Sequence, residues 1–246
     1  MLHIHRKKAT VLNIVLAIVL FVVAQNNILA QFREPNLPNH DDKPYYFGIT
    51  LGGNMASFRT SLHSRFLQDD SVYVAEPNNN GGLSLGLSAT LRLANRLETR
   101  FNPQLIFMNR SIRYKLKYPD GVENSTDNVK NIESILVSFP LQLKFHSDRI
   151  HNFRVYMMGG GKLDFDLASN ARARRADDLV KLQKVDYGAE LGIGFNFYFP
   201  TFILSPEIKV SQGLRNMHSR DVNLKYSSVI DNIQSRMIMF TLHIEG

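Results

Sequence analysis

Residues 81–93 of the chain read GGLSLGLSATLRL, with leucine or alanine at every second position from Leu83 to Leu93. Glycine, serine and threonine fill the positions between them, together with Arg92. Successive side chains of a β-strand point to opposite faces of the sheet. The pattern therefore predicts a strand with one apolar face and one small or polar face.

Seven other stretches alternate in the same way. They cover residues 45–58, 97–107, 134–145, 152–167, 187–197, 202–211 and 237–244. The connections between stretches are alternately long (near residues 59–80, 111–133, 166–185 and 214–235) and short (residues 94–96, 146–151 and 200–201). Alternating strands whose turns are short at one end only are typical of transmembrane β-barrels.

We therefore predict an all-β fold, an eight-stranded antiparallel outer-membrane β-barrel over residues 45–246, with short periplasmic turns and long extracellular loops. A soluble β-sandwich also alternates, but it explains neither the order of long and short connections nor the charged residues that repeatedly face inward. A turn at residues 94–96 would pair Leu93 with Leu97 and keep both faces of the two strands matched. We expect the chain in the cell outer membrane, with its N- and C-termini in the periplasm.

Residues 1–30 predict a secretory signal peptide. Three basic residues at positions 6–8 precede an apolar run over residues 9–24, and a small residue stands at each of two cleavage positions, after Ala24 or after Ala30. The run is short for a transmembrane helix, which needs about 20 apolar residues. An uncleaved N-terminal anchor is the alternative.

Residues 31–44 contain Pro35, Pro38 and Pro44 and are expected to form an extended periplasmic segment. This segment could be a bare tether or a handle for another subunit. The sequence has no cysteine, so neither a disulfide nor a lipid-modified cysteine is expected.

The charge of the chain is mild once the predicted signal peptide is set aside. That peptide carries three basic and no acidic residues, which leaves 26 Lys and Arg against 22 Asp and Glu. A nucleic-acid-binding surface concentrates basic residues on one face. We therefore expect no nucleic-acid partner.

The predicted lumen is rich in charge. Eight strands enclose only enough room for side chains, so no open pore is expected. The inward-facing charged residues are Arg92, Glu98, Arg100, Lys144, Arg154, Lys162, Asp164, Glu190, Glu207 and Lys209. Charges removed from water need opposite charges and hydrogen bonds, so we interpret this set as an interlocked network that plugs the barrel. A proton or ion pathway is the alternative interpretation.

One loop carries a basic cluster, formed by Arg172, Arg174 and Arg175. It is a candidate contact for lipopolysaccharide phosphates in the outer membrane or for an acidic protein. A solvated loop without a partner is the simpler interpretation.

The sequence offers no clear catalytic or metal site. Its three His-Ser dipeptides, at residues 63–64, 146–147 and 218–219, are adjacent pairs that would point to opposite faces of a strand. The eight histidines show neither an HxH nor an HExxH spacing. We expect no catalytic, cofactor-binding or metal-binding residues. A lipid A-modifying enzyme whose site is assembled between strands remains a less favoured alternative.

Four runs of the sequence resemble the PorT family, also called SprT, of small outer-membrane β-barrels. These runs are LSLGLSATLRLANRLETRFNPQLIFMNRSIRY (residues 83–114), VSFPLQLKF (137–145), DYGAELGIGFNFYF (186–199) and LSPEIKVSQGLRN (204–216). The resemblance implies a non-enzymatic accessory of the type IX secretion system, which exports proteins that carry a C-terminal signal domain. It also implies other secretion-system proteins as partners and offers no catalytic residues.

The predicted plug constrains this role. A filled eight-strand barrel cannot conduct folded cargo, so the protein should act beside a larger pore. A stand-alone structural or adhesive barrel that works through its outer loops is the competing hypothesis.

Overall fold

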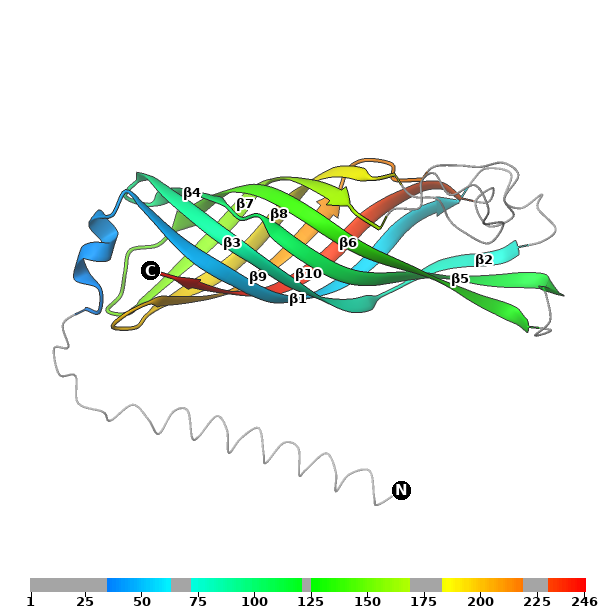
Figure 1. Ribbon diagram of the computed structural model, residues 1–246, viewed down its shortest axis with the longest axis horizontal. Helices are drawn as coiled ribbons and strands as arrows, with labels where there is room; N and C mark the ends of the chain where they lie inside the picture. Colours follow the sequence, from blue (N-terminus) through cyan, green and yellow to red (C-terminus); the bar gives the residue numbers. More distant parts are fainter. Residues whose placement is uncertain (1–34, 63–71, 121–124, 169–182, 219–229) are drawn as a thin grey trace, which may run out of the picture. The chain divides into compact units, whose positions relative to one another are not determined.

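The alternating stretches form a closed ring of antiparallel β-strands (Figure 1). The computed structural model describes residues 35–62, 72–120, 125–168, 183–218 and 230–246. Within these ranges the strands are β1 (Tyr45–Leu62), β2 (Val72–Asn78), β3 (Asn80–Ala94), β4 (Leu97–Phe101), β5 (Gln104–Asp120), β6 (Ser125–His146), β7 (Phe153–Asp166), β8 (Val185–Tyr198), β9 (Ile203–Gly213) and β10 (Ile230–Glu245). The predicted signal peptide and the candidate contact residues Arg172, Arg174 and Arg175 lie outside the described residues.

The ring closes because β1 pairs with β10 on one side and with β3 on the other. The ten described strands form eight staves, by which we mean the eight strand paths that run side by side around the ring. Strands β2 and β3 are one stave interrupted at Asn79, and β4 and β5 are one stave interrupted at Asn102 and Pro103, since β6 pairs with β4 and β5 in a single continuous register. Proline has no amide hydrogen, which explains the second interruption. The prediction of an eight-stranded antiparallel barrel is confirmed.

The two predicted faces are also confirmed. From Leu83 to Leu93 the leucines are exposed on the outer wall, whereas Ser84, Ser88 and Thr90 are buried in the lumen. Exposed phenylalanine, leucine and isoleucine side chains cover the outer wall of the other staves in the same way. An apolar band of this kind is what a barrel presents to lipid.

The first short turn differs in detail from the prediction. Arg92 pairs with Glu98, but Ala94 rather than Leu93 pairs with Leu97, and the register shifts by one residue between Arg92 and Ala94. The turn is therefore the two-residue Asn95-Arg96 with a bulge at its base. The bulge absorbs the extra residue without turning either face over.

The prediction of a long connection near residues 111–133 is wrong for most of that range. Strand β5 continues to Asp120 and β6 begins at Ser125, so the two strands form a long hairpin that projects from the barrel (Figure 1). Past Phe107 the outward side chains become polar, as at Arg113 and Lys115, while the inward ones stay buried. The sequence prediction ended the strand where the apolar outward residues end, but backbone pairing does not need apolar residues.

The expected loop near residues 59–80 is also shortened, because β1 runs to Leu62 and β2 begins at Val72. Between Val72 and Asn78, β2 pairs with β5 and lies beside the projecting hairpin. The greater part of the other two long connections, residues 169–182 and 219–229, lies outside the described residues.

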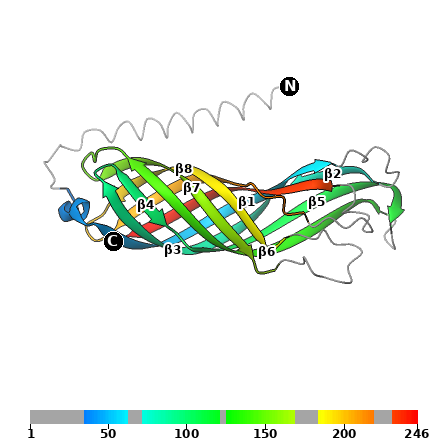
Figure 2. The same ribbon diagram turned by 90° about the horizontal axis from the view of Figure 1, so that it is seen from above.

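The sequence predicts an extended segment over residues 31–44, but the described part of this segment is not extended throughout. It contains a turn of 3-10 helix, η2 (Pro38–Asp42), which begins after Leu37 in the left-handed conformation, with φ 51°. Figure 2 shows η2 and the C-terminus at the same end of the barrel, which is also the end with the short turns. Within the described residues no helix is both long enough and apolar enough to cross a membrane.

Strand β7 contains three consecutive glycines, and glycine inside a strand often marks a bulge or a close contact. The register of β7 with both neighbours is continuous from Gly159 to Gly161, so there is no bulge. At Gly160 a Cβ atom would lie 2.1 Å from the Leu141 carbonyl oxygen. At Gly161 the nearest atom would be 3.8 Å away. The close contact with backbone is therefore confined to the middle glycine, since at Gly159 the nearest atom is Cδ2 of the flexible Leu191 side chain, 3.0 Å away.

This difference predicts the effect of two neighbouring substitutions. Gly160→Ala should destabilise the barrel by about 1–3 kcal/mol, because rigid backbone of β6 must move to admit one methyl group. Gly161→Ala, the matched control, should have little effect. Urea unfolding in lipid vesicles, followed by the heat-dependent gel shift of the folded barrel, measures both. Equal midpoints for the two variants would contradict the close contact.

Candidate functional site

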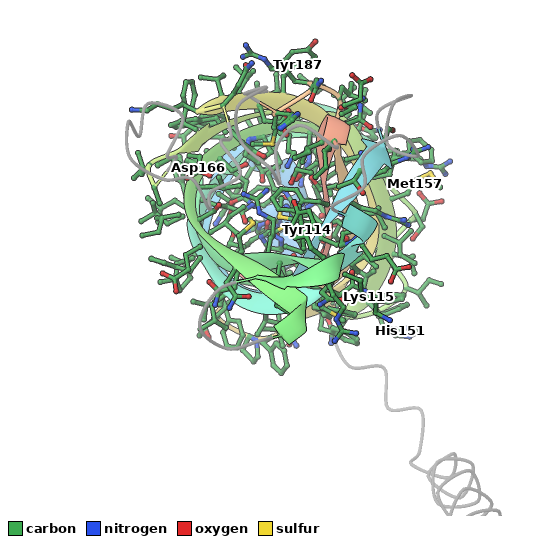
Figure 3. The ribbon with its side chains drawn as sticks, turned by 90° about the vertical axis from the view of Figure 1, so that its right-hand side faces the viewer. Tyr114, Lys115, His151, Met157, Asp166 and Tyr187 are labelled. Atoms are coloured by element: carbon green, nitrogen blue, oxygen red, sulfur yellow. The ribbon has the colours of Figure 1, made fainter. Side chains whose placement is uncertain are left out.

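The lumen is the candidate functional site, because it collects the buried charges of the molecule. Figure 3 looks along the barrel and shows Tyr114 inside the ring, whereas Met157 and Tyr187 point outward. Arg100, Lys144 and Lys209 are among the largest fully buried side chains. The inward rows therefore fill the lumen, as the width of an eight-strand barrel requires.

The centre of the network is the ion pair between Arg100 on β4 and Glu207 on β9. The Arg100 guanidinium lies 2.5 Å from a Glu207 carboxylate oxygen, and both side chains are fully buried. Tyr156 donates a hydrogen bond of 2.8 Å to the same carboxylate. The ring of His243 lies 3.6 Å from the other carboxylate oxygen. This cluster joins β4, β7, β9 and β10 across the lumen.

Gln142 links this cluster to a second ion pair. Its side-chain oxygen accepts a hydrogen bond of 2.9 Å from Arg100, and its amide nitrogen donates one of 2.7 Å to Glu190. Lys209 lies 3.4 Å from the Glu190 carboxylate. One neutral amide thus connects two buried ion pairs and uses both of its polar atoms.

A third group lies nearer the short turns. Glu98 on β4 accepts a hydrogen bond of 2.8 Å from Tyr46 and lies 3.6 Å from the Lys144 ammonium group. The Arg92 guanidinium lies 3.3 Å from the other carboxylate oxygen of Glu98. The Lys144 ammonium group also sits 4.5 Å from the centre of the Tyr156 ring. Arg92, Glu98 and Lys144, three residues of the predicted inward set, are therefore brought together.

Lys162 and Asp164 form their own pair on β7, 2.5 Å apart. Ser138 on β6 donates a hydrogen bond of 2.5 Å to the other oxygen of Asp164. Both residues belong to the predicted inward set, and they are two positions apart on the inward face of one strand.

One of the buried ion pairs that the sequence analysis missed joins Arg110 and Asp166. Arg110 on β5 is fully buried, lies 3.6 Å from Asp166 and donates a hydrogen bond of 2.5 Å to Ser134. Its guanidinium stacks over the Phe58 ring at 4.3 Å. The signal was present, since Arg110 continues the inward series of β5, but the predicted strand ended at Phe107.

The sequence analysis also missed an apolar part of the lumen. Its members are Ala56, Ile106, Met108, Leu136, Met237 and Met239, from β1, β5, β6 and β10. They are inward residues that lie next to outward apolar ones, so the alternation is hidden where both faces are apolar. The plug is therefore partly an apolar core and only partly a charge network.

The mouth at the short-turn end is covered by η2. Asp41 accepts hydrogen bonds of 3.1 and 3.2 Å from the two terminal nitrogens of Arg154. Arg92 and Arg149 each lie 3.8 Å from the same carboxylate. Arg154 was predicted to pair within the lumen, but its described ionic partner is this residue of the preceding segment. Three arginines on the barrel thus hold one aspartate of η2.

His40 fixes the other face of η2 to the barrel. The side chain is buried, with its ring 4.7 Å from that of Tyr46 and 6.2 Å from that of Tyr198. Burial, together with the nearby positive charges of Lys43 and Arg92, lowers the pKa of His40 from 6.5 to about 4. The docked ring is therefore neutral near pH 7.

Of the three His-Ser dipeptides, the described residues include only His146-Ser147 in full. No group of three or more His, Cys, Asp or Glu side chains within the described residues could hold a metal ion. His146 faces the lumen with its ring 3.5 Å from Glu98, whereas the Ser147 hydroxyl donates to the Asp148 carbonyl oxygen. As the sequence predicts for an adjacent pair, the two side chains have different partners.

Comparison with known proteins gives one family and several structures. The family described as "Outer membrane protein beta-barrel domain" matches residues 24–219. No curated protein matches the chain.

Three solved structures are similar to this chain. Neisserial surface protein A is 13% identical, with 80% of this chain and 96% of that chain covered and a TM-score of 0.43. OprG of Pseudomonas aeruginosa is also 13% identical, with 80% and 94% covered and a TM-score of 0.42. The third structure is that of Ail, the attachment invasion locus protein of Yersinia pestis, in complex with the heparin analogue sucrose octasulfate. Ail is 9% identical, with 83% of this chain and 100% of that chain covered and a TM-score of 0.39.

The Arg100–Glu207 pair predicts a large effect of one substitution. Glu207→Ala should destabilise the barrel by about 3–5 kcal/mol, because it leaves the Arg100 charge buried next to an empty position. Asp148→Ala, which removes the exposed partner of Arg96, is the control and should cost less than about 1 kcal/mol. An unchanged heat-dependent gel shift for Glu207→Ala would count against the plug.

The position of His40 predicts that η2 detaches in acid. Between pH 6.5 and about 4 the released histidine binds a proton that the docked one does not, so docking weakens steadily as the pH falls through this window. The chain has no cysteine, so a spin label on Asp42→Cys can report the mobility of η2. In a His40→Phe background this part of the pH dependence should disappear. The same acid response with phenylalanine in place would show that other groups cause it.

Proposed function

The chain belongs to the outer membrane protein beta-barrel domain family, and on that premise we propose that it is a non-enzymatic accessory of the type IX secretion system. In this role it is needed for the export of cargo proteins that carry a C-terminal secretion signal. The observation that carries the mechanism is the filled lumen, because a barrel whose interior is packed with Arg100, Lys144 and Lys209 cannot be the conduit for folded cargo. The protein would act beside a larger pore.

The secretion role itself is supported by the resemblance of the sequence to the PorT family. That resemblance includes residues 204–216 on β9, which contribute Glu207 and Lys209 to the lumen network. The charge network would then serve rigidity, since ion pairs that join several strands across the lumen hold the outer wall in one shape. A rigid wall is what a scaffold beside a moving machine requires.

Two surfaces of the barrel are suited to contact secretion-system partners. One is the apolar outer wall, which can pack against another membrane protein as well as against lipid. The other is the projecting hairpin of β5 and β6, whose outward residues near its base include Arg113 and Lys115. The orientation that we propose places the termini and η2 in the periplasm and this hairpin outside the cell, because short turns lie on the periplasmic side of such barrels.

The projecting hairpin also favours the competing role, a stand-alone adhesive or structural barrel. A rigid extension of strands can present a binding surface to the outside without any partner in the membrane. The two roles differ in one requirement, since the secretion accessory must associate with a larger outer-membrane complex and the adhesive barrel need not.

A deletion strain tests the proposal. We expect a cargo protein with the C-terminal secretion signal to accumulate in the periplasm, and the wild-type gene to restore its export. The control is a periplasmic protein without that signal, whose distribution should not change. Normal export of the cargo would reject the secretion role and favour the adhesive barrel, and altered lipid A in the same strain would instead favour an enzyme.

A further inference from the structure

Two arginines stand together on the outer wall where the apolar band ends. Ser57 of β1 pairs with Arg236 of β10, and Arg59 follows Ser57 on the same outward face. Both arginine side chains are exposed. Residues on one face of paired strands are neighbours even on the diagonal, so the two guanidinium groups can reach a common ligand.

The boundary between apolar and polar residues runs straight across three strands at this place. Met55, Ile238 and Val210 are exposed apolar residues of β1, β10 and β9. One step further from the short-turn end, the outward residues on β10 and β9 are Arg236 and its partner Gln212. A lipid that lay along this wall would have its chains below the boundary and its headgroup at the arginines.

The wall is hollowed at the same boundary. A depression of about 540 Å³ is lined by both arginines together with Val210, Gln212 and Pro77. It lies where β1 and β2 part, because the described pairing of β1 with β3 stops at Ala56 and β2 pairs with β5 (Figure 1).

A second hollow, of about 200 Å³, adjoins the first on the other side of the boundary. It is lined by Met55, Asn79, Arg236 and Ile238. Together the two hollows offer polar and apolar lining side by side, which suits an amphiphile better than a free phosphate ion.

Neither arginine is engaged elsewhere in the described part of the chain. Arg92, Arg96 and Arg154 all have carboxylate partners, but Arg59 and Arg236 have no ion pair or hydrogen bond there. Two exposed cations side by side repel each other unless an anion lies between them.

We propose that Arg59 and Arg236 bind a phosphate group of lipid A, the membrane anchor of lipopolysaccharide. The planar guanidinium group donates two parallel hydrogen bonds to phosphate oxygens, and two such groups can hold one phosphate from both sides. Acyl chains then lie over the apolar residues Met55, Ile238 and Val210. The inference rests on the proposed orientation, which puts this end of the barrel in the outer leaflet, and it does not depend on the secretion role.

Native mass spectrometry of the purified full-length barrel in detergent tests this site. The probes are bis-phosphorylated lipid A, lipid A stripped of its phosphates, and phosphatidylglycerol. The double variant Arg59→Gln/Arg236→Gln should bind bis-phosphorylated lipid A about tenfold more weakly than the wild type. The control Arg96→Gln/Lys115→Gln removes the same net charge away from the site and should bind as the wild type does. Arg59→Lys/Arg236→Lys should retain part of the affinity, because lysine keeps the positive charge but cannot donate the two parallel hydrogen bonds of a guanidinium group.

Each outcome has a defined meaning. A tenfold loss confined to the Arg59/Arg236 double variant supports the site. Equal binding by that variant, or equal binding of the phosphate-free lipid A, overturns it. Phosphatidylglycerol bound as tightly as lipid A overturns lipopolysaccharide as the source of the phosphate and indicates the opposite leaflet. Cargo export is measured separately, so failure of either proposal leaves the other standing.

Discussion

The requirement that every backbone amide in a membrane be paired governs this molecule. An open sheet would leave two unpaired edges in lipid, and each unsatisfied group there would cost several kcal/mol. Strand β1 removes both edges by pairing with β10 and with β3. Once the ring is closed with eight staves, its diameter is set, and the lumen is just wide enough for side chains. The filled interior is therefore a consequence of closure.

A lumen of that width forces its charges into contact. Arg100, Glu207, Lys209 and Glu190 come from three different strands and are all almost completely removed from water. Gln142 connects the two ion pairs through both of its polar atoms. Such a network is costly when any member is missing, and for that reason it specifies one arrangement of the staves. The same packing leaves no path for folded cargo, which is why the proposed role lies on the outer surfaces of the barrel.

The two ends of the barrel use arginine differently. At the short-turn end, Arg92, Arg149 and Arg154 surround Asp41, so their charges are balanced by η2. At the far end, Arg59 and Arg236 face outward at the edge of the apolar band, without a described carboxylate partner. The first set fastens a segment of the chain itself to the barrel. The second set is the one that we propose to bind a phosphate group of lipid A.

The sequence by itself determined the eight-stave barrel, its two faces and most of the lumen charges, because a period of two residues is a local property that any strand must obey. It did not determine where strands end, since Arg110 and Tyr114 continue the inward series after the outward residues become polar. It also did not reveal that Asp41, rather than a lumen carboxylate, is the partner of Arg154. Such contacts join residues more than a hundred positions apart, and only closure of the ring brings them together. Alternation says which way a side chain points, but the tertiary structure decides what it meets there.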